Sequence, residues 1–206
     1  MKDNINSFLL GCLNQHYKIS PEIFNIWIKI LLKNNSCFIL LNEGNELSRG
    51  NLLKIASKKN LDKNRIIFLK KLNNLSDHLN RLKLVDLFID TFPYGSHSTA
   101  CDILFTEKPL VALKGNSFAS RISSSLLNSL NLEELITNSL EDYESKINDL
   151  IKNKSKLKEI NLKIINNKKK SLFFDTKMFV QNLEKSYMKV YKNFINNKDR
   201  SNVYIN

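Results

Sequence analysis

The amino-acid sequence predicts an α/β fold in which helices cover both faces of a parallel β-sheet. Short apolar runs of four to six residues alternate with longer segments of helical periodicity over the first 113 residues. This alternation is typical of a parallel, doubly wound sheet. From Phe118 onward the pattern is almost entirely helical, so we expect a helical C-terminal third. A chain of 206 residues is long enough to bury the core of one such domain.

The expected strands are short and apolar. Residues 37–41 have the sequence Cys-Phe-Ile-Leu-Leu, an unbroken apolar run that favours a strand buried on both faces. Pro109 stands immediately before the last run, where it can end the preceding turn. The five expected strands span residues 8–13, 37–41, 65–69, 85–89 and 110–113.

The helices between the strands carry recognisable start signals. Ser20 supplies a capping hydroxyl and Pro21 occupies the first helical position, after which Trp27 lies on an apolar face that predicts core packing. Ser76 is the expected cap of a short helix that ends at Lys83, and Asp175 is the expected cap of the last helix. The other helices are expected over residues 47–59, 98–106, 118–130, 140–152 and 155–170, with the first over 21–33 and the last over 176–196. We expect one domain over residues 1–197 and a frayed tail over 198–206.

The basic character of the chain comes from lysine. The sequence holds 32 basic and 20 acidic residues, a formal charge of +12, but 27 of the basic residues are Lys and only 5 are Arg. Lys is enriched together with 29 Asn, a bias typical of A+T-rich coding, whereas readers of nucleic acid depend on Arg. A basic nucleic-acid-binding domain is therefore the least favoured interpretation. No segment approaches the ~18 consecutive apolar residues of a membrane helix, so we expect no membrane partner.

The three cysteines favour a reduced compartment. Cys12, Cys37 and Cys101 are far apart in the sequence, and no C-x-x-C motif occurs. Neither a zinc site nor a redox motif is supported, and we expect a cytoplasmic protein.

The loop after the fourth expected strand is the strongest candidate for ligand binding, because open parallel sheets bind ligands beyond the carboxyl ends of their strands. The strand ends at Asp90, a Pro-Tyr-Gly turn follows, and a helix opens with the hydroxyls of Ser98 and Thr99. The free N–H groups of a helix start suit a phosphate, and His97 stands where it can meet a phosphate or sugar oxygen. A capped helix without a ligand is the alternative.

A second candidate lies in the loop after the first expected strand. Lys18 offers a point charge at a strand's carboxyl end, which suits phosphate, although many such lysines only face solvent. The sequence contains neither a dinucleotide-binding nor a P-loop glycine motif, no D-x-D, and no cluster with metal-ligand spacing. A bound diphosphate would therefore be balanced by side chains and the helix dipole, and we expect no metal and no cofactor.

Several segments together resemble one known family. They are Asn-Gln-His-Tyr-Lys-Ile-Ser-Pro at 14–21, Asn-Arg-Ile-Ile-Phe at 64–68, Asp-Thr-Phe-Pro-Tyr-Gly-Ser-His-Ser-Thr at 90–99, Gly-Asn-Ser-Phe-Ala-Ser-Arg at 115–121 and Leu-Phe-Phe-Asp-Thr at 172–176. In this order they resemble the C-terminal catalytic lobe of the O-linked N-acetylglucosamine transferase and SPINDLY-like glycosyltransferases. The resemblance runs from about residue 8 to residue 195, and the segments at 90–99 and 115–121 are its specific part.

The resemblance implies a GT-B glycosyltransferase, in which two Rossmann-like lobes face each other across a cleft. The C-terminal lobe binds the UDP part of UDP-N-acetylglucosamine without a metal, and the enzyme transfers the sugar to a protein Ser or Thr with inversion. By motif position, Gln15 and Lys18 would meet the diphosphate, with Lys18 as the catalytic residue that stabilises the leaving UDP. The other residues implied to bind UDP-sugar are His97, Ser98 and Thr99 at phosphate and sugar, Asp102 at a ribose hydroxyl, and His78 and Arg81 along the nucleoside.

The sequence also departs from the family pattern. Leu75 stands where the family commonly has a Lys that contacts ribose, and Ser98 replaces a usual Thr while keeping the hydroxyl. The N-terminal lobe, which in the family supplies a His near the sugar and much of the acceptor surface, is not part of these 206 residues. We therefore expect a fragment, a split gene product or a remnant that needs a separate N-terminal lobe for activity. A non-catalytic nucleotide-sugar-binding module is the alternative, and the sugar and the O- or N-linkage stay open.

Overall fold

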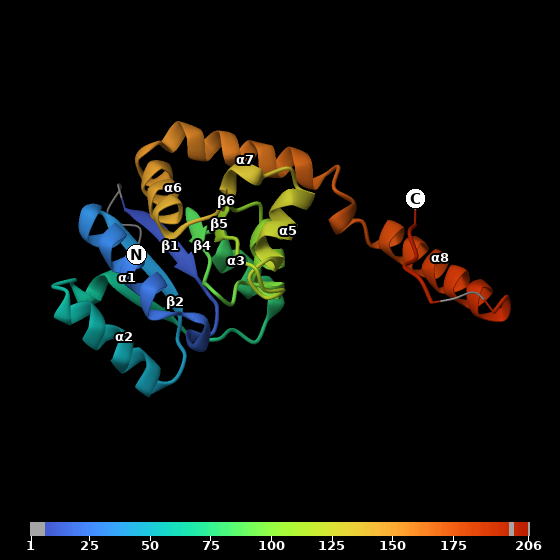
Figure 1. Cartoon of the computed structure of the whole chain (residues 1–206). Coiled ribbons are helices and arrows are strands. Elements are labelled where there is room, and N and C mark those ends of the chain that lie inside the picture. Colours follow the sequence, from blue (N-terminus) through green and yellow to red (C-terminus); the bar gives the residue numbers. More distant parts are fainter. Residues whose placement is uncertain (1–6, 198–199, 206) are drawn as a thin grey trace. The chain divides into compact units, whose positions relative to one another are not determined.

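The computed structural model describes residues 7–197 and 200–205 (Figure 1). The chain divides into two compact units, Met1–Lys168 and Lys169–Asn206. The expectation of a single domain over residues 1–197 stays a prediction. In the tail, residues 200–205 have no regular secondary structure, while 198, 199 and 206 lie outside the described residues.

The first unit is built on a six-stranded parallel sheet. Its strand order is β3-β2-β1-β4-β5-β6, and each neighbouring pair is parallel. This is the order of the doubly wound Rossmann fold, in which the direction of winding reverses between β1 and β4. The strands are β1 Phe8–Cys12, β2 Cys37–Asn42, β3 Ile66–Leu69, β4 Leu87–Ile89, β5 Leu110–Leu113 and β6 Ile136–Thr137. The predicted α/β Rossmann-like parallel sheet is confirmed, with one strand more than expected.

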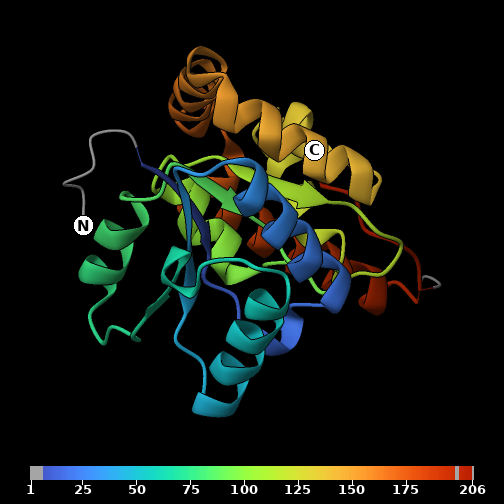
Figure 2. The ribbon, with the colours of Figure 1, turned by 90° about the vertical axis from the view of Figure 1, so that its left-hand side faces the viewer.

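Helices cover both faces of this sheet (Figure 1). One face carries α1 and α2 together with α6, which packs against α1 and β5, and Figure 2 looks onto this face. The other face carries α3, α4 and α5, of which α4 and α5 pack on β5. The helices of the first unit are α1 Pro21–Lys33, α2 Glu46–Lys58, α3 Leu75–Leu82, α4 Ser98–Phe105, α5 Ile122–Ser129, α6 Leu140–Lys152 and α7 Lys154–Lys168.

The core contains a polar chain as well as apolar packing. Trp27 and Tyr143, on α1 and α6, are both fully buried. The indole Nε1 of Trp27 donates to the hydroxyl of Tyr143 at 3.2 Å, and that hydroxyl donates to the backbone oxygen of Asp90 at 2.7 Å. The two helices are thereby tied to the end of β4, and the prediction that Trp27 belongs to the core is confirmed.

Three features differ most from the prediction: an additional strand, the start of one helix and the cap of another. Strand β6 has only two residues, too few to show an apolar period. The helix expected from Phe118 begins at Ile122, because Ser117 and Ser120 exchange hydrogen bonds in a turn. Helix α3 is capped by Asn74, whose side chain accepts from the amide of Ser76 at 2.7 Å, so Ser76 is not the cap.

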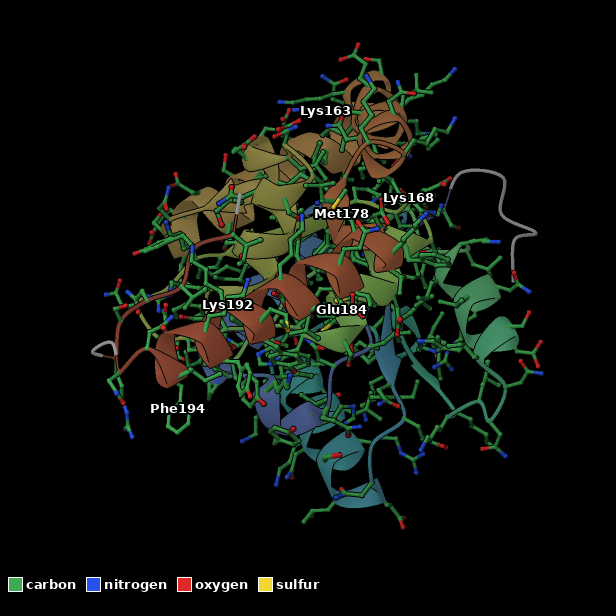
Figure 3. The ribbon with its side chains drawn as sticks, turned by 90° about the vertical axis from the view of Figure 1, so that its right-hand side faces the viewer. Lys163, Lys168, Met178, Glu184, Lys192 and Phe194 are labelled. Carbon is green, nitrogen blue, oxygen red and sulfur yellow. The ribbon has the colours of Figure 1, made fainter. Side chains whose placement is uncertain are left out.

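The second unit contains the 3-10 turn Leu172–Phe174 and α8 Thr176–Ile195. Asp175 caps α8 as predicted, since its Oδ1 accepts from the amide of Met178 at 2.9 Å. Lys192 and Phe194 point to different sides of α8 (Figure 3). Nine large apolar side chains of α8 are exposed: Phe179, Val180, Leu183, Tyr187, Met188, Val190, Tyr191, Phe194 and Ile195. Within the described residues, no helix has the length and apolar character needed to span a membrane.

Gly11 in β1 provides a test of the packing of the sheet. A Cβ atom at this position would lie 2.8 Å from Cγ1 of Val85 and 2.9 Å from Cε1 of Phe88. We expect Gly11→Ala to destabilise the protein by about 1–3 kcal/mol, because the buried neighbours must shift. Gly50 in α2 has no atom within 4 Å of such a Cβ, so Gly50→Ala should stabilise by about 0.4–1 kcal/mol. Urea unfolding of both variants measures the difference, and equal effects would contradict the packing described here.

Candidate functional site

The candidate site lies at the carboxyl ends of β1 and β4, where the strand order reverses. Ligands of open α/β sheets bind in the crevice outside this switch point. The loop after β1, residues 13–20, carries Gln15 and Lys18, and the loop after β4, residues 90–97, leads into α4. Both loops that the sequence singles out therefore lie at the same edge of the sheet.

A buried carboxylate joins these two loops. Asp90 is 2% exposed, and its Oδ1 accepts hydrogen bonds from the amides of Thr91 and Ser96, both at 2.8 Å. The same oxygen accepts from Ser96 Oγ at 2.6 Å and from Asn14 Nδ2 at 3.2 Å. Asn14 Nδ2 also lies 2.7 Å from Ser96 Oγ and 2.8 Å from Thr91 Oγ1. Asn14 comes from the β1 loop, so this network fixes the spacing of the two loops.

Opposing effects act on the ionisation of Asp90. Burial raises the pKa of Asp90, while hydrogen bonds from Ser123, Ser96 and Thr91 favour the carboxylate and lower the pKa in part.

Close packing leaves no room beside this carboxylate. A Cβ atom at Gly95 would lie 3.0 Å from Asp90 Oδ2, and the Gly95 amide donates to Ala119 O at 3.2 Å. The β4 loop is thereby held against the loop that follows β5.

Lys18 reaches from the β1 loop to the β4 loop. It lies in the 3-10 turn His16–Lys18, and its Nζ donates to the backbone oxygen of Gly95 at 3.0 Å. The same Nζ lies 3.9 Å from the centroid of the Tyr94 ring. Burial lowers the pKa of Lys18, and the negative charge of Asp90 opposes this effect. Gln15 is exposed in the same loop. The structure thus places a half-buried cation against the β4 loop, and its contact with phosphate stays a prediction.

Helix α4 begins directly after the β4 loop. His97 is the residue before the first turn, and Ser98 and Thr99 open the helix, where amide groups lack partners inside the helix. The His97 side chain caps no amide of α4. Its Nε2 is buried and has no hydrogen-bond partner within the described part of the chain. His97 lies between the rings of Tyr94 and Phe118, with centroid distances of 5.3 Å and 6.3 Å. The site therefore offers unused donors of the kind that bind an oxyanion.

His78, Arg81 and Asp102 meet between α3 and α4. Arg81 Nη2 lies 3.1 Å from His78 Nδ1, and His78 Nε2 lies 3.6 Å from Asp102 Oδ2. A guanidinium can only donate, so Nδ1 of His78 accepts and Nε2 carries the proton that faces Asp102. Burial lowers the pKa of Arg81, whose Nη1 donates to the backbone oxygen of Lys70 at 2.6 Å. The three residues implied to contact the nucleoside are thus brought together.

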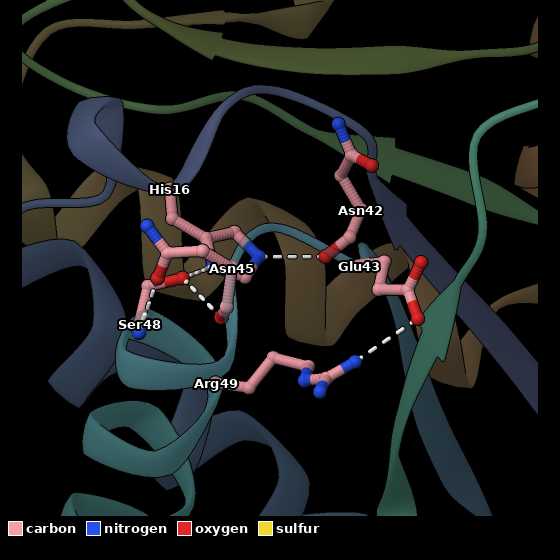
Figure 4. Close-up of polar contacts among 6 residues, drawn as sticks. All are labelled: His16, Asn42, Glu43, Asn45, Ser48 and Arg49. Carbon is pink, nitrogen blue, oxygen red and sulfur yellow. Dashed lines mark hydrogen bonds and ion pairs between the residues drawn. The ribbon is translucent and has the colours of Figure 1, made fainter.

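His16 has a structural role that the sequence does not indicate. Its Nε2 lies 2.6 Å from the backbone oxygen of Asn42, and its Nδ1 lies 2.7 Å from Ser48 Oγ (Figure 4). Gly44 has a φ of +59° and leaves no space for a Cβ atom beside the His16 ring. His16 therefore fastens the loop after β2 to the loop after β1.

Asp90 and Asn14 are the residues that sequence reasoning missed. An acidic residue at the end of a fully buried apolar strand was the available signal for Asp90. No group of three or more His, Cys, Asp or Glu side chains with a geometry suited to a metal occurs among residues 7–197 and 200–205.

Comparison with known proteins identifies the family. The family model for glycosyl transferase family 41 matches residues 5–183. The chain belongs to glycosyl transferase family 41. It is 32% identical over 187 residues to a probable UDP-N-acetylglucosamine--peptide N-acetylglucosaminyltransferase SEC of Arabidopsis thaliana, a match that covers 90% of this chain and 19% of that protein. It is 29% identical to the UDP-N-acetylglucosamine--peptide N-acetylglucosaminyltransferase of Caenorhabditis elegans, over 88% of this chain and 16% of that protein.

The fold of this family 41 chain is shared with a solved enzyme. The structure of a mutant Thermobaculum terrenum O-GlcNAc transferase superposes with a TM-score of 0.83 at 24% identity, over 91% of this chain and 36% of that one. The likeness shows that the first unit has the fold of a GT-B glycosyltransferase lobe. The chain spans about a fifth of the length of the curated relatives.

The raised pKa of Asp90 predicts a pH dependence of stability. The folded state binds more protons at Asp90 than the unfolded chain does, so the stability that this group contributes is complete below its ordinary value of 3.8 and is lost as pH rises through the raised pKa. We expect the unfolding free energy of wild type, relative to Asp90→Asn, to fall as pH rises above 3.8. Urea titrations of both proteins across this range measure the difference. A rise in favour of wild type would mean that hydrogen bonding outweighs burial.

Proposed function

We propose that this chain is the UDP-sugar-binding lobe of a protein glycosyltransferase. The reaction is transfer of N-acetylglucosamine, or a related hexose, from UDP-sugar to a protein Ser or Thr with inversion. The observation that supports the proposal is that Lys18 and the start of α4 lie close together at the carboxyl ends of β1 and β4. One cation and a set of free amide donors suit a diphosphate.

The chain's part in the reaction is electrostatic. As the oxygen of the acceptor hydroxyl forms its bond to the anomeric carbon, the bond from that carbon to UDP breaks and its electron pair moves to the diphosphate. The proton of the acceptor hydroxyl passes to a base of the proposed second lobe or to water. Lys18, with Gln15 beside it, stabilises this charge, and the amides and hydroxyls of Ser98 and Thr99 bind the phosphate oxygens. His97 Nε2, which is buried and has no hydrogen-bond partner among residues 7–197 and 200–205, is available to a phosphate or sugar oxygen. These groups replace a metal, so we propose a metal-independent enzyme without a cofactor.

The nucleoside lies along α3 and α4 in this proposal. Asp102 has a side chain that is 37% exposed and can accept a hydrogen bond from a ribose hydroxyl. His78 and Arg81 form the adjoining wall, held by each other and by the backbone oxygen of Lys70. Leu75 is 66% exposed and offers no polar contact to the ribose.

A second, N-terminal lobe is the proposed partner. The acceptor must approach the anomeric carbon from the side opposite UDP. Positioning of this kind can lower the activation free energy by on the order of 7–11 kcal/mol. The relatives are about five times longer than this chain, which leaves room for such a lobe in them. The exposed apolar side chains of α8 give that lobe a surface to pack against.

A cytoplasmic location agrees with the cysteines. Cys12, Cys37 and Cys101 are all free thiols, and Cys12 and Cys37 are buried. Disulfides persist in oxidising compartments, so three unpaired thiols favour a reducing one.

UDP should bind without a metal. At a concentration 100-fold above Kd, binding adds about 2.7 kcal/mol to the unfolding free energy and raises Tm by several degrees. We expect EDTA to leave the shift unchanged and Lys18→Met to reduce it. A DNA oligomer is the control, because binding that rests on counterion release alone should be weak and vanish with added salt. No binding at millimolar UDP, or binding that EDTA abolishes, would contradict the proposal.

Sugar transfer should require the second lobe. We expect no transfer of radiolabelled sugar to peptide by the chain alone, and activity once an N-terminal lobe is supplied. In that two-lobe enzyme, Lys18→Ala should lower kcat by on the order of a hundredfold, the usual effect of removing one preorganised donor.

The role of α8 can be tested in the same assay. Phe194, which is 77% exposed, is replaced in Phe194→Asp, and Gln181→Asp is the matched control on the same helix. Only Phe194→Asp should prevent reconstitution, and both should keep the UDP-dependent rise in Tm. Full activity from the isolated chain would show that the acceptor site lies elsewhere.

A further inference from the structure

The ammonium group of Lys18 is held by two neighbours on the β4 loop. Its Nζ lies 3.9 Å from the centroid of the Tyr94 ring and donates to the backbone oxygen of Gly95 at 3.0 Å. Attraction between a cation and the face of a tyrosine ring is worth about 0.5–2 kcal/mol, depending on its exposure to water. An ammonium group has three N–H donors, so at least one stays free to meet a ligand.

A lysine without such neighbours does not hold its positive charge in a fixed position. Its four-carbon stem is flexible, and fixing it costs about 2 kcal/mol of side-chain entropy. Groups that stabilise a developing charge are effective when they are already in place before the reaction. Contacts that hold Lys18 before the ligand binds therefore improve its effect.

The ring of Tyr94 is itself held in place. Its centroid lies 6.2 Å from that of the Tyr17 ring and 5.3 Å from that of the His97 ring. Its attachment to the β4 loop is equally fixed, because Thr91 Oγ1 donates to the backbone oxygen of Tyr94 at 2.7 Å. Tyr94 thus has neighbours for both its ring and its backbone, while its side chain stays 40% exposed.

We propose that Tyr94 is a positioning residue for Lys18, whose ring holds the ammonium group where it meets the diphosphate. The inference rests on the proposed function for the identity of the ligand. It assigns to Tyr94 no contact with UDP, and it requires the ring but not the hydroxyl. Tyr94→Phe should therefore preserve the effect, and Tyr94→Leu should remove it.

The contact can be measured in the chain without any ligand. Protons above an aromatic ring resonate upfield, so the ε-methylene of Lys18 should give a shifted signal in the chain labelled with 13Cε-lysine. Its loss in Lys18→Met assigns it. We expect the signal to persist in Tyr94→Phe and to return to the ordinary lysine position in Tyr94→Leu. An unshifted Lys18 signal in the wild type would overturn the proposal, whether or not the variants fold.

Calorimetric titration with UDP tests the consequence for binding, and UDP carries no sugar that Tyr94 could contact. Tyr94→Leu should weaken UDP binding by up to about 30-fold, because the flexible Lys18 side chain would then lose its conformational freedom only when UDP binds. In the Lys18→Met background the same change should weaken binding less than about twofold, because the two residues act through one interaction. Phe105→Leu is the matched control: Lys168 Nζ lies 4.4 Å from the centroid of that ring at the far end of α4, and UDP affinity should not change.

Two results would overturn the inference. Equal weakening by Tyr94→Leu in both backgrounds would mean that Tyr94 contacts UDP directly. Equal weakening by Tyr94→Phe and Tyr94→Leu would assign the effect to the hydroxyl. If wild type fails to bind UDP, the proposed function is wrong, and the lysine signal decides the contact between Tyr94 and Lys18 independently.

Discussion

The buried carboxylate of Asp90 holds the two ligand loops in a fixed relation. The carboxylate accepts hydrogen bonds from Ser96 in its own loop and from Asn14 in the β1 loop. The backbone oxygen of Asp90 accepts a hydrogen bond from the hydroxyl of Tyr143. Tyr143 in turn accepts from Trp27, so α1 and α6 are linked to the same point. Unmet donors in a buried network of this kind cost about 1–3 kcal/mol each. The spacing between Lys18 and the start of α4 therefore depends on a group that touches no ligand.

The proposed metal-independent reaction would depend on this arrangement. The strand order brings the loops after β1 and β4 together, and Asp90 fixes their distance. Lys18 then supplies a charge from one loop, and the free amides of α4 supply partial charges from the other. Tyr94 and Gly95 contact the ammonium group of Lys18. The result is a preorganised site whose donors need little rearrangement when charge develops.

The strands, the helix caps and the two site loops could be predicted from the sequence because their signals are local. Five apolar runs matched strands, Ser20 and Asp175 capped helices, and the loops with Lys18 and His97 proved to be neighbours. The rest depends on contacts between distant residues. Asn14 and Asp90 meet only after β1 and β4 pair, and Tyr94 gains its partner Lys18 from another loop. The two residues of β6 form a strand only because β5 is beside them.

The central claim is that a diphosphate binds where the β1 loop and α4 converge. Amide resonances of the 15N-labelled chain, followed during titration with UDP in the presence of EDTA, test it most directly. The account predicts saturable shifts of the amides of Lys18, Ser98 and Thr99, with smaller changes along α3 and none at the exposed face of α2. Absence of shifts at millimolar UDP, or shifts confined to elements away from β1 and α4, would contradict it.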